Sequence, residues 1–211
     1  MAGKLRLYHF ISSTRAEGPG LRAGLWVQGC PRHCPGCAAP ETWDFDGGFD
    51  KDVAVLAKEI LAVPKLEGVT FAGGEPFCQA GALASLARLL RQGNPALSVI
   101  CFTGWTMGEL LASRDPDKKA LLGETDLLID GPYIESLAEN DRPLVGSSNQ
   151  EFHFLTPRLR DWKKGWGASK HRLEIRISPD GSIAANGMMP GDVLREIVNK
   201  IRNGAMENEI L

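Results

Sequence analysis

Residues 68–91 read GVTFAGGEPFCQAGALASLARLLR, and this stretch predicts the fold class. Gly68–Ala72 is typical of a short buried strand, and the Ala/Leu-rich stretch Gln79–Arg91 is typical of a helix. The turn between them, Gly73-Gly74-Glu75-Pro76, follows the strand directly. A strand followed by a helix is the repeating unit of α/β folds with parallel strands. We therefore expect a parallel sheet with covering helices.

The same alternation continues on both sides of this unit. We expect further strands at Leu5–Ile11, Ala23–Gln28, Leu97–Phe102 and Thr125–Asp130. We expect further helices at Asp50–Val63, around Glu109–Ala112 after the cap Thr106, and at Pro116–Leu122 after the cap Asp115. These strands are too few for an eight-stranded barrel. An open sheet or a partial (β/α) barrel remains, and we expect the partial barrel.

The pattern changes in the C-terminal third of the chain. Residues 140–170 predict loops, and a hairpin is expected at His171–Ser178 and Ser182–Ala185 around Pro179-Asp180-Gly181. A last helix is expected at Val193–Arg202. We therefore divide the chain into a domain of residues 1–150 and an extension of residues 151–211. The extension holds a basic loop, the hairpin and the helix, and it is expected to pack on the same domain.

The composition is that of a folded protein. Of its 211 residues, 43% are hydrophobic and 24% are charged, and the net charge is −2. A general nucleic-acid binder usually has a strongly basic domain. No apolar run reaches the roughly 18 residues that span a bilayer, and the N-terminus has no signal-peptide core. We expect a cytoplasmic protein without a nucleic-acid or membrane partner.

Three of the five cysteines lie within eight residues, in the run Cys30-Pro31-Arg32-His33-Cys34-Pro35-Gly36-Cys37. Clustered thiols in a chain of this kind indicate metal binding rather than a disulfide framework. Three thiolates on one loop can hold three corners of an iron–sulfur cube and leave one iron open. A structural zinc site that uses the three cysteines with His33 or a distant ligand is the alternative. Cys78 and Cys101 are expected to be buried or lining thiols.

The turn after the central strand is the second candidate site. Strand ends in parallel α/β folds face the ligand crevice. Gly73 and Gly74 let the backbone approach a small molecule, and Glu75 can pair with a bound ammonium group. A plain turn is the alternative interpretation of these residues.

Together these motifs resemble the radical S-adenosylmethionine superfamily and, within it, the activases of glycyl radical enzymes, above all those of anaerobic ribonucleoside-triphosphate reductase. The resemblance runs from about Gly18 to Gln150. It rests on Gly18-Pro19-Gly20-Leu21-Arg22, Cys34-Pro35-Gly36-Cys37, Thr42-Trp43, Gly73-Gly74-Glu75-Pro76, Thr103-Gly104-Trp105, Asp130-Gly131-Pro132-Tyr133 and Gly146-Ser147-Ser148-Asn149-Gln150. Many superfamily members have an aromatic residue before the third cysteine, whereas this chain has Gly36, as the reductase activators do.

The resemblance implies the cofactors and the reaction. Cys30, Cys34 and Cys37 would bind a [4Fe-4S] cluster, whose open iron would chelate S-adenosyl-L-methionine. Gly73, Gly74 and Glu75 would hold the methionine end. From their positions at predicted strand ends over the site, Thr103 and Asp130 are expected to contact the ribose or the sulfonium, although a turn or cap role is equally compatible with both. The 5′-deoxyadenosyl radical would remove a hydrogen atom from a glycine of the partner, and no catalytic residues beyond these ligands are implied.

The partner classes follow from the same resemblance. The main interpretation is an anaerobic ribonucleotide reductase as target. Another glycyl radical enzyme, a peptide or a small molecule is the first alternative, and a non-catalytic zinc-binding protein is the second. A flavodoxin- or ferredoxin-type protein would donate the electron. Between Arg158 and Arg172 six basic residues and one acid alternate with two tryptophans, which is typical of a solvated loop or of a docking patch for that acidic donor.

Overall fold

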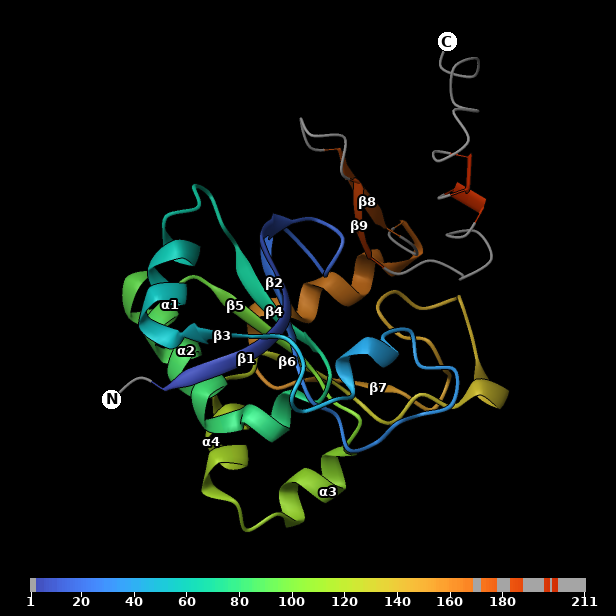
Figure 1. The fold of residues 1–211 in the computed structure, drawn as a ribbon, viewed down its shortest axis with the longest axis horizontal. Coiled ribbons are helices and arrows are strands. Elements are labelled where there is room, and N and C mark those ends of the chain that lie inside the picture. The colour runs from blue at the N-terminus through green and yellow to red at the C-terminus, as the bar shows by residue number, and fades with distance from the viewer. Residues whose placement is uncertain (1–2, 169–171, 178–182, 188–195, 198, 201–211) are drawn as a thin grey trace.

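The computed structural model describes residues 3–168, 172–177, 183–187, 196–197 and 199–200. Its centre is a sheet of seven strands in the order β3-β1-β2-β4-β5-β6-β7 (Figure 1). Four neighbouring strands are parallel, namely β2 (Arg22–Val27), β4 (Gly68–Gly73), β5 (Ser98–Phe102) and β6 (Leu127–Asp130). The edges are antiparallel: β1 (Lys4–Thr14) pairs with β2 and with β3 (Phe49–Asp52), and β7 (Glu151–Phe154) pairs with β6.

Helices cover one face of this sheet. They are α1 (Val53–Leu61), α2 (Ala80–Gly93) and α4 (Pro116–Glu124), and the shorter α3 (Met107–Ala112) follows β5. The main hydrophobic core lies between this helical layer and the sheet, and Phe71, Leu83 and Leu86 are among its fully buried members. Side-chain caps begin the helices as the sequence predicts, since Thr106 forms a capping box with Glu109 and Asp115 accepts a hydrogen bond from the N–H of Asp117.

The opposite face carries a smaller core over β5 and β6. Ile100, Leu127 and Ile129 pack there against Leu144, Val145 and Leu159. Leu159 comes from η4 (Pro157–Ala168), a 3-10 helix. Three shorter 3-10 helices occur elsewhere, η1 (Pro40–Thr42), η2 (Pro76–Gln79) and η3 (Glu135–Leu137). Residues beyond position 150 therefore complete both the sheet and its second face.

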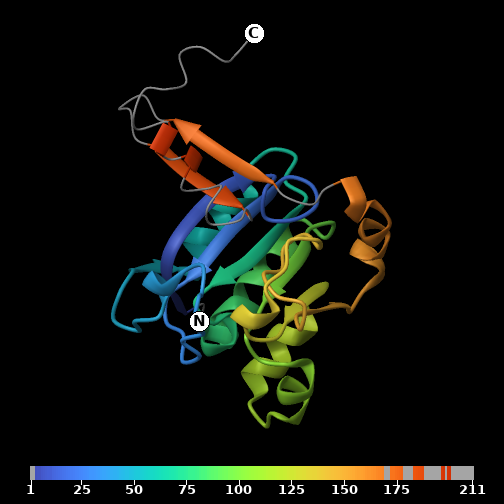
Figure 2. The ribbon, with the colours of Figure 1, turned by 90° about the vertical axis from the view of Figure 1, so that its right-hand side faces the viewer.

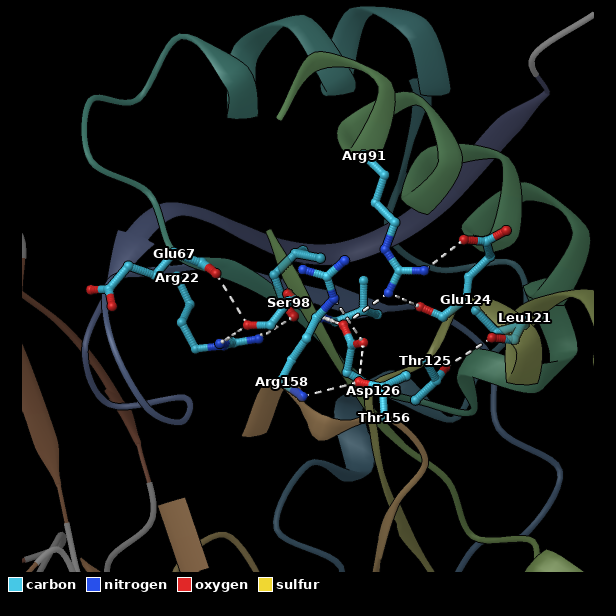
Figure 3. Close-up of polar contacts among 12 residues, drawn as sticks. Arg22, Glu67, Arg91, Ser98, Leu121, Glu124, Thr125, Asp126, Thr156 and Arg158 are labelled. Carbon is cyan, nitrogen blue, oxygen red and sulfur yellow. Dashed lines mark hydrogen bonds and ion pairs between the residues drawn. The ribbon is translucent and has the colours of Figure 1, made fainter. Parts of the chain in front are cut away.

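Buried polar contacts hold the amino ends of the parallel strands together (Figure 3). Arg22, at the start of β2, is fully buried. Its guanidinium donates to Thr70 Oγ1 at 2.9 Å, to Ser98 Oγ at 2.9 Å and to the Val69 carbonyl at 2.8 Å. Burial lowers the pKa of Arg22 to about 9. The Arg22 guanidinium can stay charged when buried because its N–H groups donate hydrogen bonds to acceptors on the adjacent strands.

Asp126, directly before β6, is the acidic centre of the same region (Figure 3). It is fully buried and accepts from the Val99 N–H at 2.7 Å and from Arg91 Nη2 at 2.8 Å. Thr156 Oγ1 donates to it at 2.7 Å, and Arg158 Nε lies at 3.4 Å. One carboxylate thus connects β5, α2 and the segment that follows β7.

The α/β class with a mostly parallel central sheet is confirmed, and so is the C-terminal hairpin. The hairpin consists of β8 (Leu173–Ile177) and β9 (Ile183–Gly187) and lies beside the end of β1 (Figure 2), where Thr14 Oγ1 donates to Glu174 at 2.8 Å. Most of the helix expected at Val193–Arg202 lies outside the described residues. Among the described helices, none has the length and apolar character to cross a membrane.

Two local expectations are wrong. The loop predicted for residues 140–170 contains β7 and η4, because the short alternating stretch Glu151–Phe154, with two phenylalanines, finds a pairing edge on β6. The first expected strand is antiparallel to its neighbour rather than parallel, since a short connection brings β1 back along β2. The sheet order has β3 and β7 at its two ends, without a pairing between them.

Candidate cluster and cofactor site

The predicted site residues meet at the carboxyl edge of the parallel strands. The loop with the three cysteines follows β2, Gly74 and Glu75 follow β4, Thr103 follows β5, and Asp130 ends β6. Main-chain hydrogen bonds connect these segments, from Gly74 N to the Val27 carbonyl at 2.8 Å and from Thr103 N to the Ile129 carbonyl at 3.0 Å. The edge is the one at which ligands bind in open α/β sheets.

The cysteine loop, Cys30–Cys37, is held at its start by the segment that follows it. Gly29 N donates to the Thr42 carbonyl at 2.8 Å, and Cys30 N donates to the Trp43 carbonyl at 3.0 Å. The rings of His33 and Trp43 stack with centroids 4.8 Å apart. Cys30 is buried, whereas Cys34 and Cys37 are half-buried. The three thiols therefore project from a loop whose path is set by the main chain.

Gly36, between Cys34 and Cys37, is required by its surroundings. Its φ of +75° is in the left-handed region that favours glycine. A Cβ at this position would lie 3.0 Å from Tyr133 Cε1, on the loop after β6. The space that a side chain before the third cysteine would need is thus taken by Tyr133.

The surroundings of Cys30 disfavour its free thiolate. Burial raises its pKa, and the backbone N–H groups of Arg32 and His33, which donate to the sulfur, offset part of that increase. The Glu75 carboxylate nearby raises it further. A bound metal removes this penalty because it stabilises the thiolate directly.

Glu75 is the buried centre of the cofactor side of the site. Its Oε1 accepts from the N–H of Phe77 at 2.9 Å and from Thr103 Oγ1 at 2.9 Å, and its Oε2 accepts from the N–H of Gly104 at 2.8 Å. Burial raises the pKa of Glu75 despite these bonds and the charge of Arg32. Since a carboxylate offers about four acceptor positions, Oε2 retains room for one more donor.

Gly74 permits the turn to touch the cysteine loop. A Cβ at Gly74 would lie 2.4 Å from the Gly29 carbonyl oxygen. At Gly73, a Cβ would lie 2.6 Å from Trp26 Cα, and the φ is +94°. The glycines therefore bring the Glu75 turn and the start of the cysteine loop into direct contact, as Glu75 N shows by donating to the Gly29 carbonyl at 2.8 Å.

Thr103 and Asp130 make protein contacts in this structure. Thr103 Oγ1 donates to Glu75 and accepts from the N–H of Trp105 at 3.1 Å. Asp130 Oδ2 accepts from the N–H of Met107, at the start of α3, at 2.5 Å, and lies 3.0 Å from His153 Nε2. Both residues thus fix the loops around the site, and their contact with a cofactor stays a prediction.

Arg32 is a site residue that the sequence did not reveal. It lies between Cys30 and Cys34, its Nη2 is 3.0 Å from Glu109 Oε2, and its guanidinium lies 4.2 Å from the centre of the Trp105 ring. The cysteine loop is therefore connected to the loop after β5. In the sequence, the only sign of this role is that Arg32 lies between Cys30 and Cys34, two candidate cluster ligands.

The donor groups around the cysteine loop fit an anionic iron–sulfur cluster. Among the described residues, the buried N–H groups of Arg32 Nε, Trp43 Nε1 and Trp105 Nε1 have no hydrogen-bond partner. Buried unpaired donors are uncommon and indicate a missing acceptor. Sulfide, thiolate and carboxylate groups would supply such acceptors.

The cysteine sulfurs do not stand in the arrangement of a tetrahedral zinc site. Zn–S bonds of 2.3 Å in a tetrahedron place sulfurs about 3.8 Å apart. Within the described part of the chain, the only group of three ligand atoms all within 4.8 Å of one another is Asp130, Glu151 and His153. The sulfurs of Cys30, Cys34 and Cys37 are therefore not all within 4.8 Å of one another in this structure.

Comparison with known proteins identifies the family. The 4Fe-4S single cluster domain matches residues 16–153, which include all three clustered cysteines. The chain belongs to this family. The anaerobic ribonucleoside-triphosphate reductase-activating protein of Vibrio cholerae, a similar protein, is 32% identical over 149 residues, which are 66% of this chain and 92% of that protein.

Two further similarities extend over smaller parts of the chain. The pyruvate formate-lyase-activating enzyme of Clostridium pasteurianum is 33% identical over 92 residues, which are 41% of this chain and 39% of that enzyme. The crystal structure of QueE from Escherichia coli covers 49% of this chain and 53% of its own, with 21% identity and a TM-score of 0.41.

Proposed function

We propose that this chain is a radical S-adenosylmethionine activase that generates a glycyl radical on an anaerobic ribonucleotide reductase. One observation carries the proposal: the three clustered cysteines lie on a single loop that contacts the Glu75 turn, in a chain of the 4Fe-4S single cluster family. The names of the relatives that match most of their own length support the reductase as target.

Each predicted residue has a task in this function. Cys30, Cys34 and Cys37 would hold the [4Fe-4S] cluster and leave one iron without a protein ligand. When bound and reduced, the cluster supplies the electron that splits S-adenosylmethionine into methionine and a 5′-deoxyadenosyl radical. The main chain of Gly73 and Gly74 would approach the methionine end. Glu75 Oε2 would accept a hydrogen bond from the ammonium group.

Thr103 and Asp130 complete the proposed cofactor site. Thr103 Oγ1 holds the Glu75 carboxylate in place and lies at the end of β5, beside the predicted position of the cofactor. Asp130 holds the start of α3 and ends β6 at the same edge. A ribose hydroxyl or the sulfonium would be within reach of either residue at the strand ends. Burial of Thr103, Glu75 and Asp130 excludes water from this side of the site.

The proposal also covers the curvature of the sheet, the division into domains, the cellular compartment and the electron donor. We propose that the parallel strands curve as a partial (β/α) barrel around the cofactor. We also propose that residues 1–150 form the catalytic domain, and that the extension of residues 151–211 packs on the same domain and adds β7 and η4 to it. Thiolate ligands need a reducing compartment, which favours the cytoplasm. A flavodoxin- or ferredoxin-type protein is the proposed electron donor.

The docking patch for this donor is proposed at the basic stretch 158–172. Part of its charge is already paired, because Arg158 lies near Asp126 and Lys164 Nζ lies 2.6 Å from Asp161. Reversing the charge of Lys163 and Lys164 should lower the flavodoxin-driven rate at low salt. An unchanged rate would remove the patch from the proposal.

An anaerobic assay tests the function. The protein is reconstituted with iron and sulfide, reduced with dithionite and given S-adenosylmethionine, and 5′-deoxyadenosine is quantified. The anaerobic ribonucleoside-triphosphate reductase from the same source is then added, and the glycyl radical is measured by electron paramagnetic resonance. Deoxyadenosine without the radical would favour another glycyl radical enzyme as target, in line with the pyruvate formate-lyase-activating relative. A full cluster without deoxyadenosine would contradict the activase.

A further inference from the structure

Two large apolar side chains are exposed on the loop that follows β6. Ile134 is 37% exposed and Leu137 is 42% exposed, and both belong to a segment that we call the recognition loop, residues 132–138. Single exposed apolar residues are common on protein surfaces. Here two of them occur within four residues, on a loop beside the proposed cluster site.

The recognition loop touches the cysteine loop. A Cβ at Gly36 would lie 3.0 Å from Tyr133 Cε1 and 3.4 Å from Glu135 Oε1. The opposite edge of the Tyr133 ring packs on Gly146, where a Cβ would lie 3.1 Å from Cδ2. The Tyr133 ring is thus held between two glycines, one from the cysteine loop and one from the segment Gly146–Gln150. Ile134 directly follows this ring in the chain.

The segment Gly146–Gln150 uses its polar groups to hold the recognition loop. Asn149 Nδ2 donates to the Pro132 carbonyl at 2.8 Å, and Ser147 Oγ accepts from the N–H of Ile134 at 3.2 Å. Ser148 N donates to the Leu137 carbonyl at 2.8 Å. These are internal contacts, so the segment does not itself bind a ligand through these groups. Its effect is to present the recognition loop in one conformation.

We infer that the recognition loop, through Ile134 and Leu137, is the surface that docks the glycine-bearing segment of the partner enzyme. The inference rests on the proposed function. A hydrogen atom passes only between groups that are about 3–3.5 Å apart, so the partner's glycine must come next to the cofactor and its flanking residues must lie on the surrounding loops. The recognition loop is one of those loops, since it contacts Gly36.

The exposed side chains of the recognition loop predict the kind of segment that would bind to it. Ile134 and Leu137 require apolar side chains opposite them, and the exposed Glu135 carboxylate favours a lysine or arginine beside them. An apolar centre with a polar rim is the usual arrangement of a protein interface. The partner is therefore a glycine-bearing segment with apolar flanks and a basic residue.

The test compares the I134S/L137S double variant with a matched control. Val55→Ser changes an apolar side chain that is 48% exposed on α1, in the helical layer away from the strand ends. For both proteins, deoxyadenosine formation without partner is the reference for a folded and loaded enzyme. The anaerobic ribonucleoside-triphosphate reductase from the same source is the probe, and its KM in glycyl radical formation is the readout.

We expect the double variant to raise the KM for the reductase at least tenfold, which corresponds to about 1.4 kcal/mol, with V55S near the wild type. Glu135→Lys should raise the KM as well and weaken its dependence on salt. An unchanged KM in I134S/L137S, with wild-type deoxyadenosine formation, overturns the inference and leaves the proposed function intact. A changed self-association with an unchanged KM would assign the surface to a second copy instead. Failure of the wild-type protein to form deoxyadenosine would contradict the proposed function.

Discussion

Replacing Asp126 by alanine should destabilise the whole fold, because this carboxylate is fully buried and connects three elements. Removing one member of a buried ion pair costs about 3–5 kcal/mol, since the remaining charge is left without compensation. Arg91 retains Glu124, at 2.9 Å, and is itself 22% exposed. The loss should therefore lie near the lower limit, about 3 kcal/mol.

The assay is thermal unfolding of the cluster-free protein, followed by circular dichroism. For a chain of this size, 1 kcal/mol shifts Tm by about 2–4 °C, so D126A should unfold about 6–12 °C below the wild type. Arg88→Ala is the matched control. It removes an ion pair to Glu124 whose arginine is 50% exposed, and exposed pairs contribute only about 0–1 kcal/mol.

The result that would refute this reasoning is a D126A Tm as close to the wild type as that of R88A. The network at the amino ends of the strands would then contribute no more than surface pairs do. Asp126→Asn separates the charge from the hydrogen bonds, because an amide oxygen can still accept from Val99 N or Thr156 Oγ1. We expect its Tm between those of D126A and the wild type.

Three further predictions concern the site. Alanine at Cys30, Cys34 or Cys37 should each abolish the absorbance of the cluster near 400 nm and deoxyadenosine formation, and full activity in any one variant would contradict the ligand assignment. Burial raises the pKa of Glu75, so S-adenosylmethionine should bind more weakly as the pH falls through that raised value, because the protonated carboxyl no longer attracts the ammonium group. Glu75→Gln should bind weakly at every pH, and a wild-type affinity measured by calorimetry would disprove the pairing. Thr103→Val should raise the KM for S-adenosylmethionine about tenfold by removing a hydrogen bond to Glu75, whereas Thr103→Ser should retain the wild-type KM.

Sequence reasoning located the elements whose signals are local. The strand Gly68–Ala72, the turn after it and the caps Thr106 and Asp115 depend on neighbours in the chain, and the structure has them at or within a residue or two of the expected positions. The clustered cysteines were recognisable because their ligand chemistry requires close spacing.

Contacts between distant segments were beyond that reasoning. Arg22 stands in the sequence only as the last residue of the Gly18–Arg22 motif, yet it is fully buried with partners up to 76 residues away. β7 was missed for the same reason, since only the edge of β6 makes Glu151–Phe154 a strand. The Gly146–Gln150 motif was informative about family, but its physical task, holding residues 132–138, became visible only in three dimensions.

The main-chain bonds from Gly29 and Cys30 to Thr42 and Trp43 involve no sulfur atom. The start of the cysteine loop is therefore positioned by the main chain and not by a thiol, in contrast to small zinc domains that fold only around their metal. We expect loss of a cluster to leave the sheet and this anchor folded. A protein that has lost its cluster in air is then expected to regain activity when iron and sulfide are supplied, without new synthesis.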